Sequence, residues 1–491
     1  MDKLFLEENL KMSNDSRSKT KIRTYGQHLT PIEIFKKFIL PDIRNELYDY
    51  IWVDLFAGEG NLILPILDEI PETERIKFFT DNIWLFDIQQ EMVDKAIENA
   101  LHYGIPFELA KEHITRRDTI KDYPLFLKKR GMPLFHITNP PYLYIGYIKK
   151  HAETQRYLDY FTGLNKGFQD LYQLALMNDL RAEIQRAIYI IPTNFLFGAS
   201  VSNQIRDQFF QFYTITKIIT FEKKIFDLTG TNVMICQFAR KTQKNKDIIK
   251  FSGIKINSET HEREYLLSPI NHYRAGSEFE TFVEKYRSSE PPVVKWYLME
   301  TEVKANIGDK ELIVVDANDF HSSKYRKQRI YVNDVLYKRI KDNILFIRTV
   351  DTGSMDGRAG LYSIPEVFEV DGIMVSKSPY RTHPIQLFTN LSIEDQILLK
   401  EYFNFVLEYF RDLTDSEFMT TYKYSDSKYV RKYLGLSQAK KLIETFPSKA
   451  ERKEIGYIIK NRDVEMLIDF LNHVKYTNAG SKFNYKLKNN L

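Results

Sequence analysis

The sequence predicts an α/β protein with a doubly wound, mixed but mostly parallel sheet in its first half and an α+β region in its second half. Apolar, strand-like runs alternate with helical stretches between residues 24 and 240, as a parallel sheet requires. Polar side chains follow several of these runs directly. From about residue 248 the strand-like runs become short and are separated by turns, and after about residue 392 apolar residues recur at helical spacing.

These changes in pattern predict three segments. Residues 1–23 are expected to be a flexible N-terminal segment, because most of them are polar or basic. Residues 24–245 would form one domain and residues 246–491 a second domain whose last part is helical. The charged run 241–247 is either the boundary zone or the tip of a hairpin.

Composition excludes several classes of protein. The single cysteine, Cys236, rules out a disulfide framework and a cysteine-based zinc site within the chain, and we expect no metal. No run approaches 18 apolar residues, and the N-terminus lacks the apolar core of a secretory signal, so we expect no membrane partner and a cytoplasmic location.

Net charge is only +4, but it is unevenly distributed. Residues 1–240 carry 30 basic and 31 acidic side chains, whereas residues 241–491 carry 40 and 35. The small positive excess lies in the second half, where a surface for nucleic acid is expected.

The first strand-like run, 50–53, leads into Asp54-Leu55-Phe56-Ala57-Gly58-Glu59-Gly60-Asn61. A buried strand that enters a Gly-x-Gly turn suits a doubly wound unit, and glycines let the backbone approach a ligand closely. The apolar run after Asn61 predicts a helix. Ile63 stands where a dinucleotide fingerprint needs its third glycine, which argues against binding of a pyrophosphate.

Two carboxylates follow the next strand-like runs. Asp87 ends the run 83–86 and precedes a helix expected over 90–100; a carboxylate at the end of the second strand commonly binds the two hydroxyls of a ribose. Asp118 follows the run 114–117 and could accept a hydrogen bond from an adenine amino group. The alternative for each acid is a helix N-cap or a solvated turn.

The run Asn139-Pro140-Pro141-Tyr142 follows a strand expected over 134–138. It combines an amide that can accept from an exocyclic NH2, prolines with fixed φ and no N–H, and a ring that can stack on a flat base. Such a set suits methyl transfer to a planar amine, whose lone pair is delocalised until acceptors bind its two protons. The alternative is a Pro-Pro turn that ends a strand.

The order of three motifs resembles a known family. A Thr24-Tyr25-Gly26-Gln27-His28-Leu29-Thr30-Pro31 segment precedes the glycine turn, and Asn139-Pro140-Pro141-Tyr142 comes third. The chain is similar to the gamma class of adenine-specific DNA amino-methyltransferases of bacterial type II restriction–modification systems. The resemblance covers roughly residues 22–240. It implies a Rossmann-like catalytic domain that uses S-adenosylmethionine.

Site residues are carried over from this resemblance. Asn139 and the carbonyl of Pro140 would accept the two amino protons of a flipped adenine, while Tyr142 and Phe226 would stack on that base. The cofactor-binding residues that it implies are Thr30, Pro31, Asp54, Phe56, Gly58, Gly60, Asp87, Ile88, Asp118, Thr119 and Asn139.

Basic segments of the second half could contact DNA. Residues 324–341 contain seven basic side chains and one acid, and residues 422–433 interleave cations with tyrosines. Such segments position a protein on phosphates, although a basic run is also often just a solvated face. The candidates are Lys324, Arg326, Lys327, Arg329, Lys423, Lys428, Arg431, Lys432 and, from a glycine-rich turn, Arg358.

The sequence therefore predicts a site-specific enzyme that methylates N6 of adenine in double-stranded DNA, with a target-recognition domain in its second half. A separate cognate restriction endonuclease is a candidate partner, and we expect a monomer, although a palindromic site would suit a dimer. Alternatives are the same transfer to cytosine N4, RNA or a protein glutamine, or a non-catalytic DNA-binding relative. Failure to bind the cofactor would favour the last of these.

Overall fold

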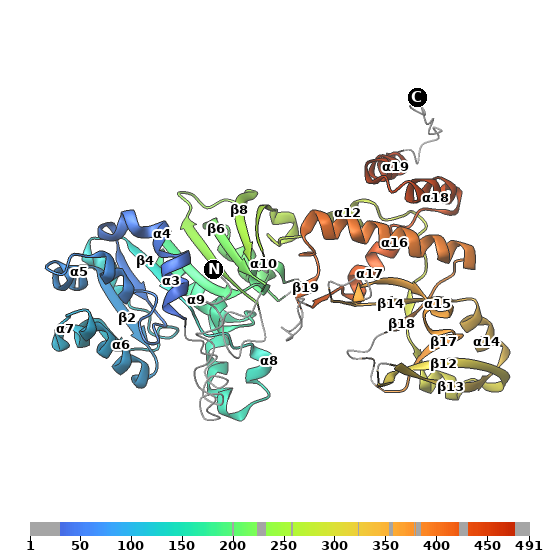
Figure 1. Ribbon diagram of the computed structural model, residues 1–491, viewed down its shortest axis with the longest axis horizontal. Helices are drawn as coiled ribbons and strands as arrows, with labels where there is room; N and C mark the ends of the chain where they lie inside the picture. The colour runs from blue at the N-terminus through green and yellow to red at the C-terminus, as the bar shows by residue number, and fades with distance from the viewer. Residues whose placement is uncertain are drawn as a thin grey trace. The chain divides into compact units, whose positions relative to one another are not determined.

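The computed structural model describes residues 30–198, 201–222, 232–256, 259–322, 324–352, 357–377, 379, 384–421 and 431–476. The chain forms two compact units, Met1–Ala275 and Gly276–Leu491 (Figure 1).

A nine-stranded sheet forms the centre of the first unit. Its strand order is β3-β2-β1-β4-β5-β7-β6-β8-β9, and five of the eight pairs are parallel while three are antiparallel. This confirms the predicted mixed, mostly parallel α/β fold. The strands are β1 Ile51–Asp54, β2 Ile83–Asp87, β3 Ile114–Arg116, β4 Leu134–Thr138, β5 Arg186–Pro192, β6 Tyr213–Phe221, β7 Val233–Arg240, β8 Ile249–Ile256 and β9 Thr260–Leu267.

Both faces of this sheet are covered, which is why its strands read as continuous apolar runs. In β1, Trp52 packs into the core on one face, whereas Ile51 and Val53 pack into a cluster on the other. The α-helices of this unit are α3 Ile32–Phe38, α4 Leu40–Ile43, α5 Arg75–Asn82, α6 Gln90–His102, α7 Phe107–His113, α8 Ile145–Ile148, α9 Leu171–Ala182, α10 Asn194–Phe197 and α11 Asn203–Phe209. Figure 1 shows α6 and α7 beside β2.

Shorter 3-10 segments connect these elements. They are η2 Arg44–Asp49, η3 Leu64–Glu69, η4 Leu125–Arg130, η5 Ala152–Phe161, η6 Gly163–Asn165 and η7 Pro269–Asn271. The helix predicted after Asn61 is only η3. The segment ends at Ile70, whose extended backbone is the conformation favoured for a residue before a proline, here Pro71, so the run is cut short.

The first unit also extends beyond the expected boundary at residue 245. Residues 241–247 are the connection between β7 and β8, and β8 pairs in parallel with β6. The hairpin of β8 and β9 therefore continues the same sheet. A charged run is typical of any exposed turn, whether it joins two strands of one sheet or two domains. Composition alone therefore misplaced the end of this unit.

Helix α9 connects two loops near the carboxyl ends of the strands. At its start, Asp170 Oδ1 accepts a hydrogen bond from the Leu143 N–H at 2.9 Å. One turn before its end, the Asn178 side chain donates to the carbonyls of Thr119 and Ile120 at 3.3 and 3.0 Å. Next to it, the buried Asp179 accepts hydrogen bonds from Tyr123, His136 and Tyr189.

The second unit combines three small sheets with a helical layer, as an α+β region does. The sheets have the orders β10-β18-β14-β16, β11-β17-β12-β13 and β15-β20-β19. The strands are β10 Lys295–Trp296, β11 Leu298–Met299, β12 Ile307–His321, β13 Lys324–Val332, β14 Leu345–Arg348, β15 Val350–Asp351, β16 Gly360–Ser363, β17 Gly372–Val375, β18 Ile385–Phe388, β19 Thr420–Thr421 and β20 Lys432–Tyr433.

Its longest helix is α16, Ile393–Thr414. The apolar stripe predicted there is core, since Tyr402 and Val406 are buried among other apolar side chains. The other helices are α12 Glu278–Lys285, α13 Glu300–Ala305, α14 Asp334–Lys341, α15 Ile364–Phe368, α17 Leu436–Ile443, η9 Lys449–Glu451, α18 Arg452–Lys460 and α19 Val464–Tyr476.

Candidate active site

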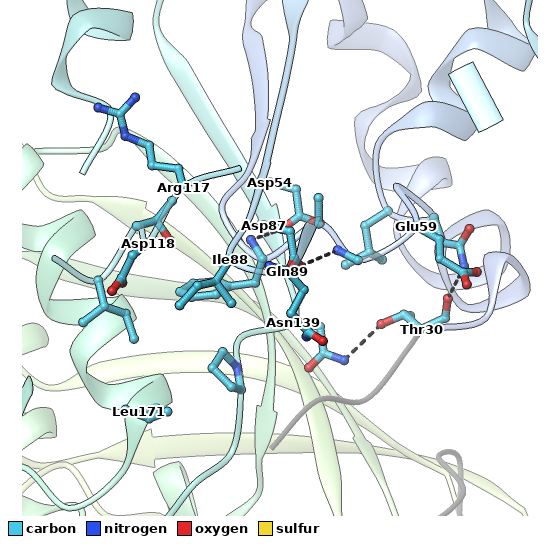
Figure 2. A pocket seen from close by; sticks show the side chains of 18 of the residues that line it. Thr30, Asp54, Glu59, Asp87, Ile88, Gln89, Arg117, Asp118, Asn139 and Leu171 are labelled. Atoms are coloured by element: carbon cyan, nitrogen blue, oxygen red, sulfur yellow. Dashed lines mark hydrogen bonds between the residues drawn. The ribbon is translucent and has the colours of Figure 1, made fainter. Parts of the chain in front are cut away.

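A pocket lies where β1, β2, β3 and β4 end. These strands are parallel neighbours, so the residues that follow them meet at one edge of the sheet. The pocket encloses about 810 Å³, open solvent included, which suits a nucleoside-sized ligand. Figure 2 shows Asp87 between Asp118 on one side and Thr30 with Glu59 on the other.

The glycine turn after β1 forms one wall. Gly58 has φ +54° and Gly60 has φ +83°, both in the left-handed region that favours glycine. A Cβ on Gly60 would come within 2.6 Å of the Leu64 side chain. Gly58 and Phe56 line the pocket, whereas Gly60 shapes the turn without being part of the lining.

Asp87, at the end of β2, accepts hydrogen bonds that hold the glycine turn next to this strand. Its Oδ2 accepts from the Gly58 N–H at 2.9 Å and its Oδ1 from the Gln89 N–H at 2.8 Å. Burial raises the pKa of Asp87 above its usual range, while these backbone donors oppose that effect. The Ile88 N–H is a third backbone donor to this carboxylate. Because a carboxylate has about four lone-pair sites, at least one is left for a ligand hydroxyl. Ile88 also lines the pocket.

Asp54 is buried in the wall at the end of β1. Its Oδ1 accepts from the Phe56 N–H at 3.0 Å and from Thr138 Oγ1 at 2.5 Å. Burial raises its pKa to about 7, and these two hydrogen bonds only partly offset that rise. Asp54 can therefore change charge near neutral pH.

Asp118 stands at the far end of the pocket, where Tyr160 donates a hydrogen bond to its Oδ2 at 2.6 Å. Thr119 is buried beside it and donates to the Leu55 carbonyl at 2.9 Å, which holds this loop against β1. Sequence reasoning missed Tyr160 and its neighbour Tyr157, both of which line the pocket.

Asn139 lies at the opposite side, near the N-terminal residues of the described chain. Its Nδ2 donates to Thr30 Oγ1 at 3.0 Å, and Tyr142 donates to its Oδ1 at 2.5 Å (Figure 2 shows the first of these bonds). The Tyr142 hydroxyl is also 2.7 Å from the Ile190 carbonyl. It has one proton for two acceptors, so it can donate fully to only one of them at a time.

Two of the expected proline contacts lie outside the lining. Pro140 is buried and does not line the pocket, whereas Pro141 does. Pro31 is the N-cap of α3 and is not part of the lining either, although Thr30 is. Asn61, which donates to the Thr30 carbonyl at 3.0 Å, is a further lining residue that sequence reasoning missed.

The side chains that line the pocket are mostly acidic among those that can carry a charge. Four carboxylates face one guanidinium there, that of Arg117. The carboxylates are Asp54, Glu59, Asp87 and Asp118. An acidic, glycine-walled pocket fits a cationic nucleoside ligand and disfavours a pyrophosphate. In the parts of the chain that the structure describes, no group of three His, Cys, Asp or Glu could hold a metal ion.

The basic residues expected to meet DNA are partly paired with acids. Lys324, Arg326, Lys327 and Arg329 are exposed on β13. The last three lie 3.5–3.6 Å from Asp319, Glu369 and Glu311, respectively. Exposed pairs of this kind contribute little stability, so they can exchange partners at low cost.

The remaining candidates are distributed over other elements. Arg358 forms an ion pair with Glu408, and Lys432 donates to the Asp415 carbonyl at 2.9 Å. Arg431 is exposed. Phe226, Lys423, Lys428 and residues 24–29 of the N-terminal motif lie outside the described residues.

Among the helices that are described, none has the length and apolarity needed to cross a membrane.

Comparison with known families agrees with this fold. The profile of the N-6 DNA methylase family matches residues 12–306, which is more than half of the 491 residues. The chain belongs to the N-6 DNA methylase family. Membership implies methyl transfer from S-adenosylmethionine and N6 methylation of adenine at the level of the family. No curated protein matches the chain.

Several solved structures are similar to this chain at low identity. The type IIL restriction–modification enzyme MmeI, solved with DNA, is 12% identical over 96% of this chain and 78% of its own, with a TM-score of 0.50. A type I methyltransferase subunit from Streptococcus thermophilus is 15% identical, covering 48% and 49%, with a TM-score of 0.34. A putative type I modification subunit from Vibrio vulnificus YJ016 is 14% identical, covering 74% and 64%, with a TM-score of 0.35. The chain thus spans about half of the former subunit and just under two thirds of the latter.

Proposed function

We propose that this chain transfers the methyl group of S-adenosylmethionine to N6 of an adenine that is flipped out of a specific double-stranded DNA sequence. One observation carries the proposal: Asp87, Asp118 and Asn139, which are distant in sequence, line the same acidic pocket at the carboxyl ends of adjacent parallel strands. S-adenosylmethionine is a cation that supplies an electrophilic methyl group, and the lining residues fit it.

The amide of Asn139 is the proposed acceptor for one amino proton of the target adenine, and the Pro140 carbonyl for the other. Two acceptors draw the amine lone pair out of conjugation, and they stabilise the cationic nitrogen by pre-aimed dipoles, without a strong base. The Tyr142 hydroxyl now occupies Asn139 Oδ1. It can release that oxygen by donating to the Ile190 carbonyl, which lies 2.7 Å away.

Aromatic stacking is the proposed compensation for base flipping. Extrusion costs a few kcal/mol of pairing and stacking, and each aromatic face contributes roughly 1–3 kcal/mol. Tyr142 and Phe226 are the two candidates. Stacking on two rings can offset the whole free energy of base flipping, whereas stacking on one ring can fall short of it.

The motif order supports assignment to the gamma class, and the unit Gly276–Leu491 is the proposed target-recognition unit. Its basic candidates would contact phosphates, with β13 as the main contributor. A separate cognate endonuclease is the proposed partner, and a monomer acting in the cytoplasm is the simplest form of the enzyme.

Methylation-sensitive sequencing of DNA from cells that express the chain tests the proposal, with Asn139→Ala as the matched control. One enriched motif that carries N6-methyladenine and disappears in the control is the expected result. N4-methylcytosine in its place would move the target to cytosine. An unmodified genome, together with measured cofactor binding, would move it to RNA or a protein glutamine, and loss of cofactor binding in the unaltered chain would favour a non-catalytic relative.

A further inference from the structure

Two tyrosines that belong to no recognised sequence motif form one wall of the pocket, at the end where Asp118 is proposed to bind adenine. Segment η5 brings Tyr157 and Tyr160 against the loop that carries Asp118. Both tyrosines are buried, with 4% and 8% of their surface exposed. Their rings pack against each other with centroids 5.6 Å apart.

Tyr160 is fixed in place from several directions. Its carbonyl accepts a hydrogen bond from the Asn165 side chain at 2.8 Å. The Lys121 ammonium lies 4.8 Å from the centre of its ring. Its hydroxyl donates to Asp118 Oδ2 at 2.6 Å, and burial with that hydrogen bond raises its pKa far above the ordinary tyrosine range. The hydroxyl therefore remains a donor at every physiological pH.

Asp118 has little else to orient it. Its carboxylate is half-buried, and the only other donor recorded to it among the described residues is the Lys121 N–H, at 3.3 Å from Oδ1. That distance is too long for a strong hydrogen bond. With Oδ2 held by Tyr160, Oδ1 is the oxygen left for a ligand.

We propose that Tyr160 is a positioning residue that makes this pocket selective for a 6-aminopurine: it holds the Asp118 carboxylate so that an acceptor meets the exocyclic amine. A 6-oxopurine presents an acceptor at that place, which an ionised carboxylate repels. This inference rests on the proposed function, because it assigns the selectivity of the same cofactor pocket.

Isothermal titration of the full-length protein with S-adenosylhomocysteine and S-inosylhomocysteine tests it. These ligands differ on one edge of the purine: the adenosyl ligand has a 6-amino group and an unprotonated N1, and the inosyl ligand has a 6-oxo group and an N1–H. The unaltered chain is expected to prefer the adenosyl ligand by about tenfold or more, the size of one charge-assisted hydrogen bond. In the Tyr160→Phe and Asp118→Asn variants, this affinity ratio is expected to fall to about threefold or less. The double variant is expected to lose no more of the preference than either single variant, because both substitutions remove the same interaction.

Tyr157→Phe is the matched control. Its hydroxyl pairs with the Arg156 guanidinium at 2.9 Å and not with Asp118, so the adenosyl preference should persist there. Because the ratio is measured within each variant, partial misfolding lowers both affinities and leaves the ratio readable.

The outcomes separate this inference from the proposed function. Tight, selective binding that persists in Tyr160→Phe overturns the inference and leaves the function intact. Equal binding of the two ligands by the unaltered chain overturns it as well. Binding of neither ligand by the unaltered chain overturns the proposed function, and the inference with it.

Discussion

Replacing Asp54 with asparagine is expected to stabilise the first unit at neutral pH. Burial raises the pKa of Asp54 from 3.8 to about 7, so the folded state holds this proton more tightly than the unfolded chain. The resulting stabilisation is fully present below about pH 4 and is lost as pH rises through about 7. Above that range the folded state contains a buried carboxylate.

The size of the effect follows from the pKa. Each pKa unit corresponds to about 1.4 kcal/mol. Relative to low pH, the free energy of unfolding is therefore lower by about 1.5 kcal/mol at pH 5, where only the unfolded chain is ionised, and by about 4 kcal/mol at pH 8, where both states are ionised. Both hydrogen bonds from Phe56 and Thr138 end on the same oxygen. An amide oxygen can accept both of them while the charge disappears.

Urea unfolding at pH 5 and pH 8 measures this prediction. Trp52 and Trp84 are buried in the first unit, so fluorescence in a Trp296→Phe background, applied to both proteins, follows that unit. The gain from Asp54→Asn should be about 2.5 kcal/mol larger at pH 8 than at pH 5. Equal gains at the two pH values would refute the reasoning.

Three further results are expected. Asn139→Asp should lower single-turnover methylation by about 10²–10³-fold and leave DNA affinity in gel shifts nearly unchanged, since its contact matters most in the transition state; equal losses in both would contradict this. Tyr142→Phe, which keeps the ring, should weaken binding of DNA containing a mismatched target adenine less than Tyr142→Ala, which should cost about 1–3 kcal/mol; equal losses would argue against stacking. S-adenosylmethionine should bind more tightly at pH 8 than at pH 6 as Asp54 ionises, and calorimetry should show a flatter profile for Asp54→Asn.

The parallel strands explain why so much of the pocket could be predicted. Asp87, Asp118 and Asn139 each follow a strand whose apolar run is legible in the sequence, and parallel strands bring the residues that follow them to one edge. Their common place in the pocket is thus a consequence of strand order. Their individual roles remain predictions.

Tyr160 shows why other parts could not be predicted. It lies 42 residues after Asp118, in a 3-10 segment that carries no motif to link it to the pocket. Only the tertiary fold brings the two side chains together. The end of the first unit was missed for a related reason, because the pairing of β8 with β6 is a long-range contact that the charged turn before it does not encode.

Helix α9 contacts both the loop proposed to bind the cofactor and the loop proposed to bind the target base. Its first residues hold the loop after Tyr142 through Asp170, and its last turns hold the Asp118 loop through Asn178 and Asp179. A helix of 12 residues is a rigid rod about 18 Å long. The separation between the loop proposed to bind the cofactor and the loop proposed to bind the target base is therefore set by one rigid secondary-structure element.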